Sequence, residues 1–255
     1  MGRVVFIGAG PGAADLITVR GARTLSRADV VLFDALTDPA LRELAPRARW
    51  VNVGKRGFAD STGQATINAL LLRHARAVAL VVRLKGGDPS VFGRLEEELE
   101  ALQHAGIACE VIPGVTAALA AAAETQRPLT RRGAGRSVAL ATAMTREGAL
   151  RGSRGADTEV LYMAGKQLAA LARRLREAGW ADDAPVSVVS RAGWPDALAS
   201  THEVATLGRA SVLHSGRPTV VTVGAGAATL GAGTRAPGES PHLETGQALA
   251  ETPSP

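Results

Sequence analysis

The sequence has a single cysteine, few aromatic residues and no histidine pair at metal-binding spacing. Because Cys109 stands alone, the chain forms no internal disulfide and no metal site built from several cysteines. None of the five histidines is four residues from another, as two histidines on one face of a metal-binding helix would be, so we expect no bound metal. Aromatic residues make up 3% of the chain, which leaves few platforms for stacking nucleic-acid bases.

Long apolar runs are also missing. A proline, a glycine and a threonine interrupt the longest candidate, residues 111–123, whereas a membrane helix needs about 18 or more consecutive apolar residues. The first apolar segment starts at Val4 with the pattern of a strand and not of a signal peptide. We therefore expect a cytoplasmic protein that binds neither membranes nor nucleic acids.

The composition is that of an ordinary globular protein with an excess of arginine. Its 255 residues are 46% apolar and 21% charged, which suits one large or two small domains. The formal net charge is +5, and lysine stands only at positions 55, 85 and 166. Arginine binds carboxylates through paired hydrogen bonds, so the excess suits a polycarboxylate ligand as well as a solvated surface.

The first half alternates short β-rich runs with helical patterns. Such an alternation predicts a largely parallel sheet covered by helices. We expect strands at residues 4–7, 30–33, 50–53, 78–84 and 109–112, and helices at 15–27, 39–45, 64–76 and 95–105.

The second half has the pattern of a mixed α/β domain. Pro113–Gly114 is the expected hinge, which predicts domains at residues 1–113 and 114–231. After residue 231 the chain is rich in glycine, proline, serine and glutamate, so residues 232–255 are predicted to be a disordered tail. We expect strands at residues 137–142, 159–163, 185–190, 203–206 and 219–223, and helices at 116–124 and 166–178.

Two glycine-rich loops each follow a predicted strand. The first is Gly8–Gly12, and the second is at Gly86–Gly87, followed directly by Asp88. Glycine allows a backbone to approach a ligand closely, and the aspartate offers an acceptor. Because the carboxyl ends of parallel strands meet at one edge of a sheet, the pair predicts one cleft that holds a small cofactor.

The first loop could also be interpreted as a dinucleotide fingerprint. Gly8, Gly10 and Ala13 fit G-x-G-x-x-G/A, and Asp34 would then bind a ribose hydroxyl. Pro11, however, removes an N–H from the turn that would hold a pyrophosphate, and the second loop has no place in that fingerprint. A cofactor without phosphates, such as S-adenosyl-L-methionine, fits better.

Motifs from about residue 3 to residue 224 resemble, in order, those of the tetrapyrrole methylases. The GKR and RLKGGDPxxFGR elements are closest to the uroporphyrinogen-III C-methyltransferases within that family. The resemblance implies two α/β domains with S-adenosyl-L-methionine in the cleft between them, no metal, and a homodimer. It also implies methylation of uroporphyrinogen III at C2 and C7 to precorrin-2, for sirohaem or cobalamin synthesis. The matching segments are residues 5–12, 29–34, 53–56, 82–89, 92–94, 111–117, 127–130 and 162–163.

The resemblance also implies roles for individual residues. Asp34 would be the proton acceptor and Lys55 the proton donor, with Arg94 and Glu97 near the substrate. Arg56 and Arg83 are further candidate anchors for the substrate's carboxylates, whereas the rest of the glutamate run 96–98 is expected on a solvated helix face. The residues implied to contact the cofactor are Pro11, Gly86, Gly87, Asp88, Val91, Thr116, Ala117, Met163 and Ala192.

Departures from the family pattern gather at positions expected near the substrate. They leave three hypotheses open: methylation of uroporphyrinogen III, methylation of another precorrin, and a cofactor-binding protein without catalysis. The departing positions are Asp60–Ser61, Gly63–Gln64, Leu95–Glu96, Arg131–Arg132 and Thr142–Met144.

Overall fold

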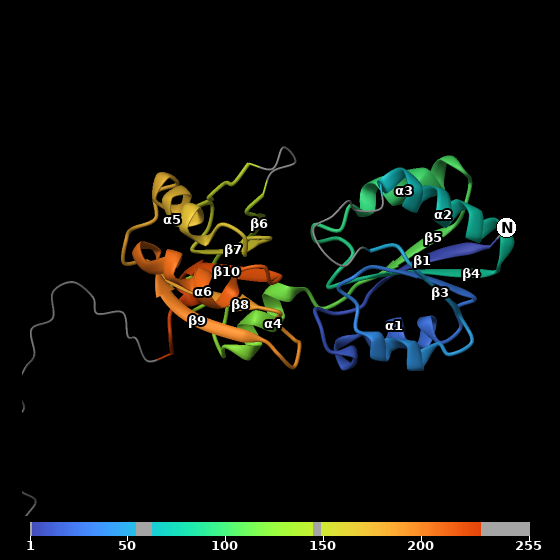
Figure 1. Cartoon of the computed structure of the whole chain (residues 1–255), viewed down its shortest axis with the longest axis horizontal. Coiled ribbons are helices and arrows are strands. Elements are labelled where there is room, and N and C mark those ends of the chain that lie inside the picture. The colour runs from blue at the N-terminus through green and yellow to red at the C-terminus, as the bar shows by residue number, and fades with distance from the viewer. Residues whose placement is uncertain (1, 55–62, 145–148, 231–255) are drawn as a thin grey trace, which may run out of the picture.

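The computed structural model describes residues 2–54, 63–144 and 149–230, which form two five-stranded sheets flanked by helices (Figure 1). The strands of the first sheet are all parallel, as the alternating pattern predicts, and their order is β3-β2-β4-β1-β5. They are β1 (Arg3–Gly8), β2 (Val30–Phe33), β3 (Arg49–Asn52), β4 (Leu80–Lys85) and β5 (Cys109–Ile112).

Helices cover both faces of the first sheet, α1 (Val19–Leu25) on one face and α2 (Gln64–Ala77) and α3 (Leu95–His104) on the other (Figure 1). Leu25 of α1 packs with one face of the central strands, and Leu71 and Leu102 pack with the opposite face. Because β1 and β4 are buried on both faces, their sequences are nearly continuous apolar runs.

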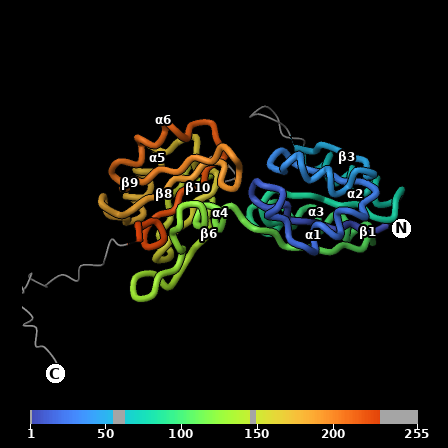
Figure 2. Tube along the Cα trace, turned by 90° about the horizontal axis from the view of Figure 1, so that it is seen from below, coloured from blue at the N-terminus to red at the C-terminus, as the bar shows by residue number. Residues whose placement is uncertain are grey.

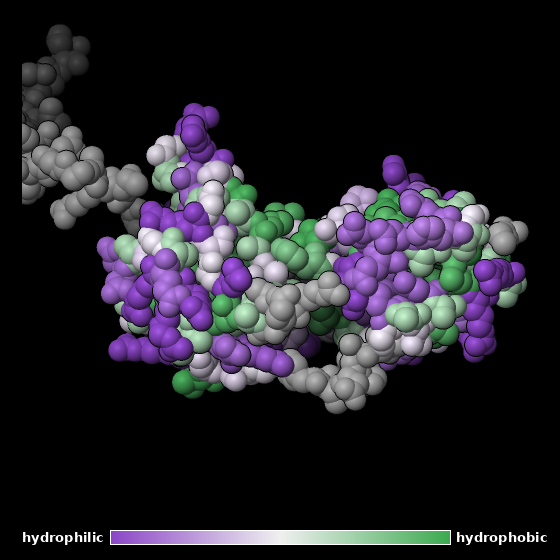
Figure 3. Space-filling model, turned by 90° about the horizontal axis from the view of Figure 1, so that it is seen from above, coloured by the Kyte–Doolittle hydropathy of each residue, from purple (hydrophilic) through white to green (hydrophobic). Residues whose placement is uncertain are grey.

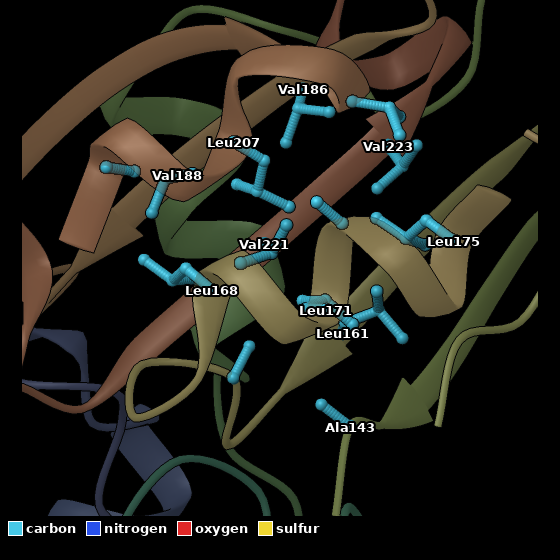
Figure 4. Close-up of a cluster of buried hydrophobic side chains, with 14 residues drawn as sticks. Ala143, Leu161, Leu168, Leu171, Leu175, Val186, Val188, Leu207, Val221 and Val223 are labelled. Atoms are coloured by element: carbon cyan, nitrogen blue, oxygen red, sulfur yellow. The ribbon is translucent and has the colours of Figure 1, made fainter. Parts of the chain in front are cut away.

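The second sheet is mixed, with the order β6-β7-β10-β8-β9. Only the β6–β7 pair is parallel. Helix α5 (Leu168–Glu177) covers one face, where Leu171 and Leu175 pack near Val221 and Leu161 (Figure 4), and α4 (Ala117–Glu124) covers the other. The strands are β6 (Val138–Thr142), β7 (Thr158–Tyr162), β8 (Pro185–Ser190), β9 (Leu198–Glu203) and β10 (Thr219–Gly224), and a short helix, α6 (Ser211–His214), follows β9.

Three of the predicted elements differ from the structure. The helix expected at 39–45 is a 3₁₀ helix, Pro39–Leu44. The strand expected at 203–206 is wrong: β9 ends at Glu203, where a capping box with Thr206 starts a 3₁₀ segment, Val204–Ala210. The sequence pattern misses β9 because this edge strand is mostly exposed and lacks an apolar face. The helix expected at 15–27 is interrupted, because Thr18 accepts a hydrogen bond from the Gly21 N–H and starts α1 there.

The chain passes from the first sheet to the second between Ile112 and Val138, through α4 (Figure 2). The exact domain boundary at residues 113–114 stays a prediction, and the predicted tail 232–255 lies outside the described residues. The strands of the first sheet run from the N-terminal end of the molecule toward the second sheet (Figure 1). Their carboxyl ends, where ligands bind in open α/β sheets, therefore face the second half of the molecule.

Candidate functional site

A cavity of about 410 Å³ lies where the carboxyl ends of the first sheet face the second sheet. In the first half its lining comes from the segments after β1, β2, β3 and β4 and from α2 and α3. In the second half it comes from the start of α4, the ends of β7 and β8, and the start of β10. Hydrophobic residues gather where the two halves meet (Figure 3). A cavity of this volume suits a small-molecule ligand.

The two glycine-rich loops meet at this cavity, as the sequence predicts. The Gly87 N–H donates to the Gly10 carbonyl at 2.7 Å, and the Gly10 N–H donates back at 3.3 Å. Both residues have positive φ angles, 82° at Gly10 and 68° at Gly87, a conformation that favours glycine. The loops are therefore joined backbone to backbone, without side chains between them.

A third glycine segment, at the start of the link to the second sheet, packs against the same loops. A Cβ atom on Gly8 would lie 2.5 Å from Gly114 Cα, and one on Gly114 would lie 2.7 Å from Gly8 Cα. The Asp88 carboxylate stabilises this contact, since its Oδ2 accepts a hydrogen bond from the Gly114 N–H at 2.8 Å. Its Oδ1 accepts one from the Ser90 N–H, also at 2.8 Å. Asp88 thus ties the second glycine loop to the link between the sheets.

Asp34 lies at the end of β2, half-buried at the edge of the cavity. Its carboxylate accepts hydrogen bonds from the Gly86 N–H at 3.2 Å and from the Leu36 N–H at 3.2 Å. Two backbone donors therefore hold an acceptor group at a fixed position beside the second glycine loop.

A buried charged cluster forms the floor of the cavity. Glu98 of α3 is 1% exposed, and its carboxylate contacts Lys85 Nζ at 3.0 Å, Arg83 Nε at 3.2 Å and Gln64 Nε2 at 3.3 Å. Burial lowers the pKa of the Lys85 ammonium, and the neighbouring Arg83 charge lowers it further, while Glu98 offsets part of that decrease. Glu98 is thus the shared counter-charge of two buried cations.

This cluster corrects one expectation and bears on another. The glutamate run is not uniformly solvated: Glu96 and Glu97 are exposed, whereas Glu98 is buried. Helical periodicity explains the difference, since only one of three consecutive positions on α3 faces the sheet. Arg83 lines the cavity, but its side chain is 4% exposed and donates to Glu98 and to the Leu84 carbonyl, and its role as a substrate anchor stays a prediction.

The loop before α3 passes directly over Lys85. A Cβ atom on Gly93 would lie 2.5 Å from the Pro89 carbonyl oxygen and 3.1 Å from Lys85 Cε, so only glycine fits. Arg94 lines the cavity and forms two hydrogen bonds with Glu97, Nε–Oε1 at 2.8 Å and Nη2–Oε2 at 2.7 Å. Glu97 is not among the lining residues, and it reaches the cavity only by its contact with the lining residue Arg94.

Backbone strain is concentrated at the cavity. Among the described residues, positive φ angles at non-glycine positions occur at Phe92, Arg94, Gln126, Met163 and Arg191, and all except Gln126 line the cavity. Left-handed conformations at such residues are unfavourable and persist mainly where function or packing requires them. Their gathering at one place therefore makes this cavity the candidate functional site.

The residues that the second half contributes to the cavity wall are mostly apolar or uncharged. Tyr162 Oη and Thr116 Oγ1 share a hydrogen bond of 2.6 Å, and the Phe92 ring lies 5.0 Å from the Tyr162 ring between centroids. Burial raises the pKa of the Tyr162 hydroxyl. Ala192 is buried at 5% exposure, and Met163 is half-exposed.

The structure brings most of the predicted site residues together, and their individual roles stay predictions. Lys55 and Arg56 lie outside the described residues. The sequence analysis does not single out Trp194 and Arg191, which line the cavity in the loop after β8. Their position at the end of a predicted strand, next to Ala192, could have indicated them. The predicted residues that line the cavity are Pro11, Asp34, Gly86, Gly87, Asp88, Val91, Arg94, Thr116, Ala117, Met163 and Ala192.

Two of the sequence departures lie away from the cavity. Arg131 and Arg132 line a separate cavity with Arg154 and Trp180 on the second sheet. Thr142–Met144 is not among the lining residues of the central cavity, and Ala143 is part of the core under α5. The departures from the family pattern at these positions therefore do not alter the residues that line the central cavity.

Sheet topology argues against the dinucleotide interpretation. In a dinucleotide-binding fold the first two strands are neighbours, so that the acidic residue after the second strand reaches the ribose. Here β4 lies between β1 and β2. In the part of the chain that the structure describes, no three histidine, cysteine or acidic side chains gather as metal ligands, and no helix has the length and apolarity to cross a bilayer.

Comparison with known proteins identifies relatives over most of the chain. Residues 3–210 match the family of tetrapyrrole (corrin/porphyrin) methylases. A uroporphyrinogen-III C-methyltransferase of Pseudomonas aeruginosa is 45% identical over 75% of this chain and 80% of its own length. Another, from Synechocystis, is 38% identical over 88% of this chain and 89% of its own length.

A solved structure shares the fold. Uroporphyrin-III C-methyltransferase from Thermus thermophilus, complexed with S-adenyl homocysteine, superposes with a TM-score of 0.77 at 36% identity. The superposition covers 88% of this chain and 97% of that structure. The predicted fold class, with two α/β domains of the tetrapyrrole methylase type, is confirmed.

The buried cluster predicts that replacing Glu98 lowers the stability of the protein much more than replacing the neighbouring Glu97. Replacing Glu98 by Ala leaves Arg83 and Lys85 buried without a counter-charge, which we expect to lower the free energy of unfolding by about 3–5 kcal/mol. Glu97→Ala is the control, because the pair that Glu97 forms with Arg94 is exposed and its loss should cost about 0–1 kcal/mol. Urea denaturation measures both, and equal losses would contradict the buried cluster.

Proposed function

Because the chain belongs to the tetrapyrrole (corrin/porphyrin) methylases, we propose that it methylates carbon atoms of uroporphyrinogen III with S-adenosyl-L-methionine, giving precorrin-2. The observation that carries this proposal is the strained cavity at the joined glycine loops, in a chain whose relatives are named for this reaction. We further propose that the enzyme is a cytoplasmic homodimer and that precorrin-2 serves sirohaem or cobalamin synthesis.

The residues of the cavity fit S-adenosyl-L-methionine. A Cβ atom on Gly87 would meet no atom closer than 3.9 Å, so this glycine leaves room on the side of Thr116 and Val115. Pro11 has no N–H to offer, which suits a ligand without phosphates better than a pyrophosphate. When bound, the cofactor supplies an electrophilic methyl group for an electron-rich pyrrole carbon. The residues proposed to hold it are Pro11, Gly86, Gly87, Asp88, Val91, Thr116, Ala117, Met163 and Ala192.

Asp34 is the proposed proton acceptor. Methylation of a macrocycle carbon requires a proton to leave the ring system, and a carboxylate held by two backbone N–H groups at the cavity edge can accept it. Lys55, outside the described residues, is the proposed proton donor. The buried ammonium of Lys85 supplies positive charge beneath the same cavity.

Arg94 is the proposed anchor for a substrate carboxylate, with Glu97 as its positioning partner. The two-point contact with Glu97 fixes the guanidinium plane at the cavity. Uroporphyrinogen III carries eight carboxylates, so an arginine with a defined orientation can select the position of the macrocycle.

A different tetrapyrrole is the second candidate substrate. The observation that favours it is that Leu95 and Glu96 follow Arg94, at two positions where the family usually has glycines. Leu95 is half-buried against the core under α3, and Glu96 adds an exposed negative charge beside the proposed anchor. Such a charge would disfavour a carboxylate at that position.

Incubation of the enzyme with uroporphyrinogen III and methyl-labelled S-adenosyl-L-methionine tests the proposed reaction. We expect two labelled methyl groups per macrocycle. Transfer only to other precorrins would support the second candidate, and tight cofactor binding without any transfer would mean that the protein lacks catalysis.

Replacing Asp34 by Asn tests the proton acceptor. We expect kcat to fall by about 10²–10⁴-fold, because the amide cannot take up the proton. The affinity for S-adenosylhomocysteine, measured by calorimetry, should stay within about twofold. Asp15→Asn, at an exposed position outside the cavity, is the control. An unchanged kcat in the Asp34 variant would remove this residue from the mechanism.

Replacing Gly87 by Val tests the ligand space beside the second glycine loop. We expect S-adenosylhomocysteine to bind at least about tenfold more weakly, because the side chain enters the cavity. Gly106→Val is a matched control: its φ of 66° imposes the same backbone strain as the 68° of Gly87, and its Cβ would meet no atom within 4 Å. Equal affinities in the two variants would place the cofactor elsewhere.

A further inference from the structure

Arg191 is the single charged residue that the second half contributes to the described lining of the central cavity. It follows β8 directly and has a φ angle of 53°. The first half, by contrast, contributes several charged residues to the lining, among them Asp34, Lys85 and Arg94. A lone cation on a largely neutral wall is placed to meet a negative group of a ligand.

The guanidinium of Arg191 is held in a fixed orientation. Its Nε donates to Asp196 Oδ1 at 2.7 Å, and its Cζ lies over the Trp194 ring, 4.4 Å from the centroid. Trp194 also lines the cavity. An arginine that is both ion-paired and stacked has lost most of its side-chain freedom before any ligand binds, which favours tight and directional binding.

Asp196 is itself held in place by hydrogen bonds that lead to the interior of the second half. Its Oδ2 accepts from Arg217 Nη2 at 3.0 Å, and Arg217 Nε donates to Ser190 Oγ at 3.2 Å. The same hydroxyl contacts Nδ1 of the fully buried His214 at 2.9 Å. A continuous series of polar contacts thus connects the core of the second half to Arg191.

This arrangement engages Nε and one face of the guanidinium. Within residues 2–54, 63–144 and 149–230, no acceptor contacts either Nη group of Arg191. Both amino groups remain for an oxygen ligand, and a carboxylate matches their geometry. The left-handed backbone at Arg191, unfavourable for an arginine, is retained at the cavity wall.

We propose that Arg191 binds a carboxylate of the ligand in the central cavity. The carboxylate belongs either to the amino-acid part of the cofactor or to an acetate or propionate arm of the macrocycle. This inference deepens the proposed function and rests on it for the identity of the two ligands. Asp196 and Trp194 are positioning residues, because they act through Arg191.

Equilibrium binding to Arg191→Ala distinguishes the two sources. The probes are S-adenosylhomocysteine, 5′-methylthioadenosine, which lacks the amino-acid part, and uroporphyrin III, which keeps the eight carboxylates. A weakening of about 10- to 100-fold for S-adenosylhomocysteine with unchanged methylthioadenosine binding assigns the cofactor's carboxylate. The same loss for uroporphyrin III with unchanged S-adenosylhomocysteine binding assigns the macrocycle.

Two further variants separate binding from folding. Arg191→Lys keeps the charge and should recover part of the lost affinity, while Asp196→Asn, which releases the guanidinium, should weaken the same probe by a few fold. Arg173→Ala, at an exposed position on α5, is the control and should bind all three probes as the wild type does. Thermal unfolding shows whether each variant is folded.

The proposal is overturned if folded Arg191→Ala binds all three probes as tightly as the wild type. It is also overturned if S-adenosylhomocysteine and methylthioadenosine weaken equally, since that loss would not involve a carboxylate. These measurements require no turnover. Absence of methyl transfer by the wild type would therefore reject the proposed reaction while the comparison of binding still decides the role of Arg191.

Discussion

The site depends on a close approach of three backbone segments, in which Gly8 and Gly114 leave no space for a side chain. The loops after β1 and β4 exchange hydrogen bonds at Gly10 and Gly87, and Gly8 packs against Gly114 at the start of the link to the second sheet. Asp88 fastens the same contact by accepting the Gly114 N–H. Because these contacts are made by backbone atoms, they place the second half of the molecule over the carboxyl ends of the first sheet and so create the cavity.

The cavity floor adds a second constraint, an electrostatic one. Arg83 and Lys85 alternate with apolar residues on β4, and both point toward Glu98 of α3. Two cations can be buried there because the Glu98 carboxylate contacts both, and the Gln64 amide donates a further hydrogen bond to that carboxylate. The result is positive charge beneath a ligand site, close to the carboxylate of Asp34, without exposure of the cluster to solvent.

The two walls of the cavity differ in chemistry, which suits a ligand that is partly apolar and partly ionised. The first half presents backbone groups, carboxylates and cations. Among its described residues the second half presents Tyr162, Met163, Trp194 and small residues around one oriented cation, Arg191. Strained backbone at the lining residues of both halves shows that side-chain direction here is maintained against local preference.

The sequence by itself determined the parallel first sheet, the mixed second half, the two glycine loops and the residues around them, because period-two and helical patterns and strand-end glycines are local signals. It also indicated the family through ordered motifs. The missed strand β9, the burial of Arg83 and Glu98, and the position of Arg191 were decided only by the tertiary structure. Each depends on which residues, distant in the sequence, pack against it. No local pattern distinguishes an edge strand without an apolar face from a loop. Nor does a local pattern distinguish a cation beside a buried carboxylate, or an arginine held by Asp196 and Trp194, from a solvated surface residue.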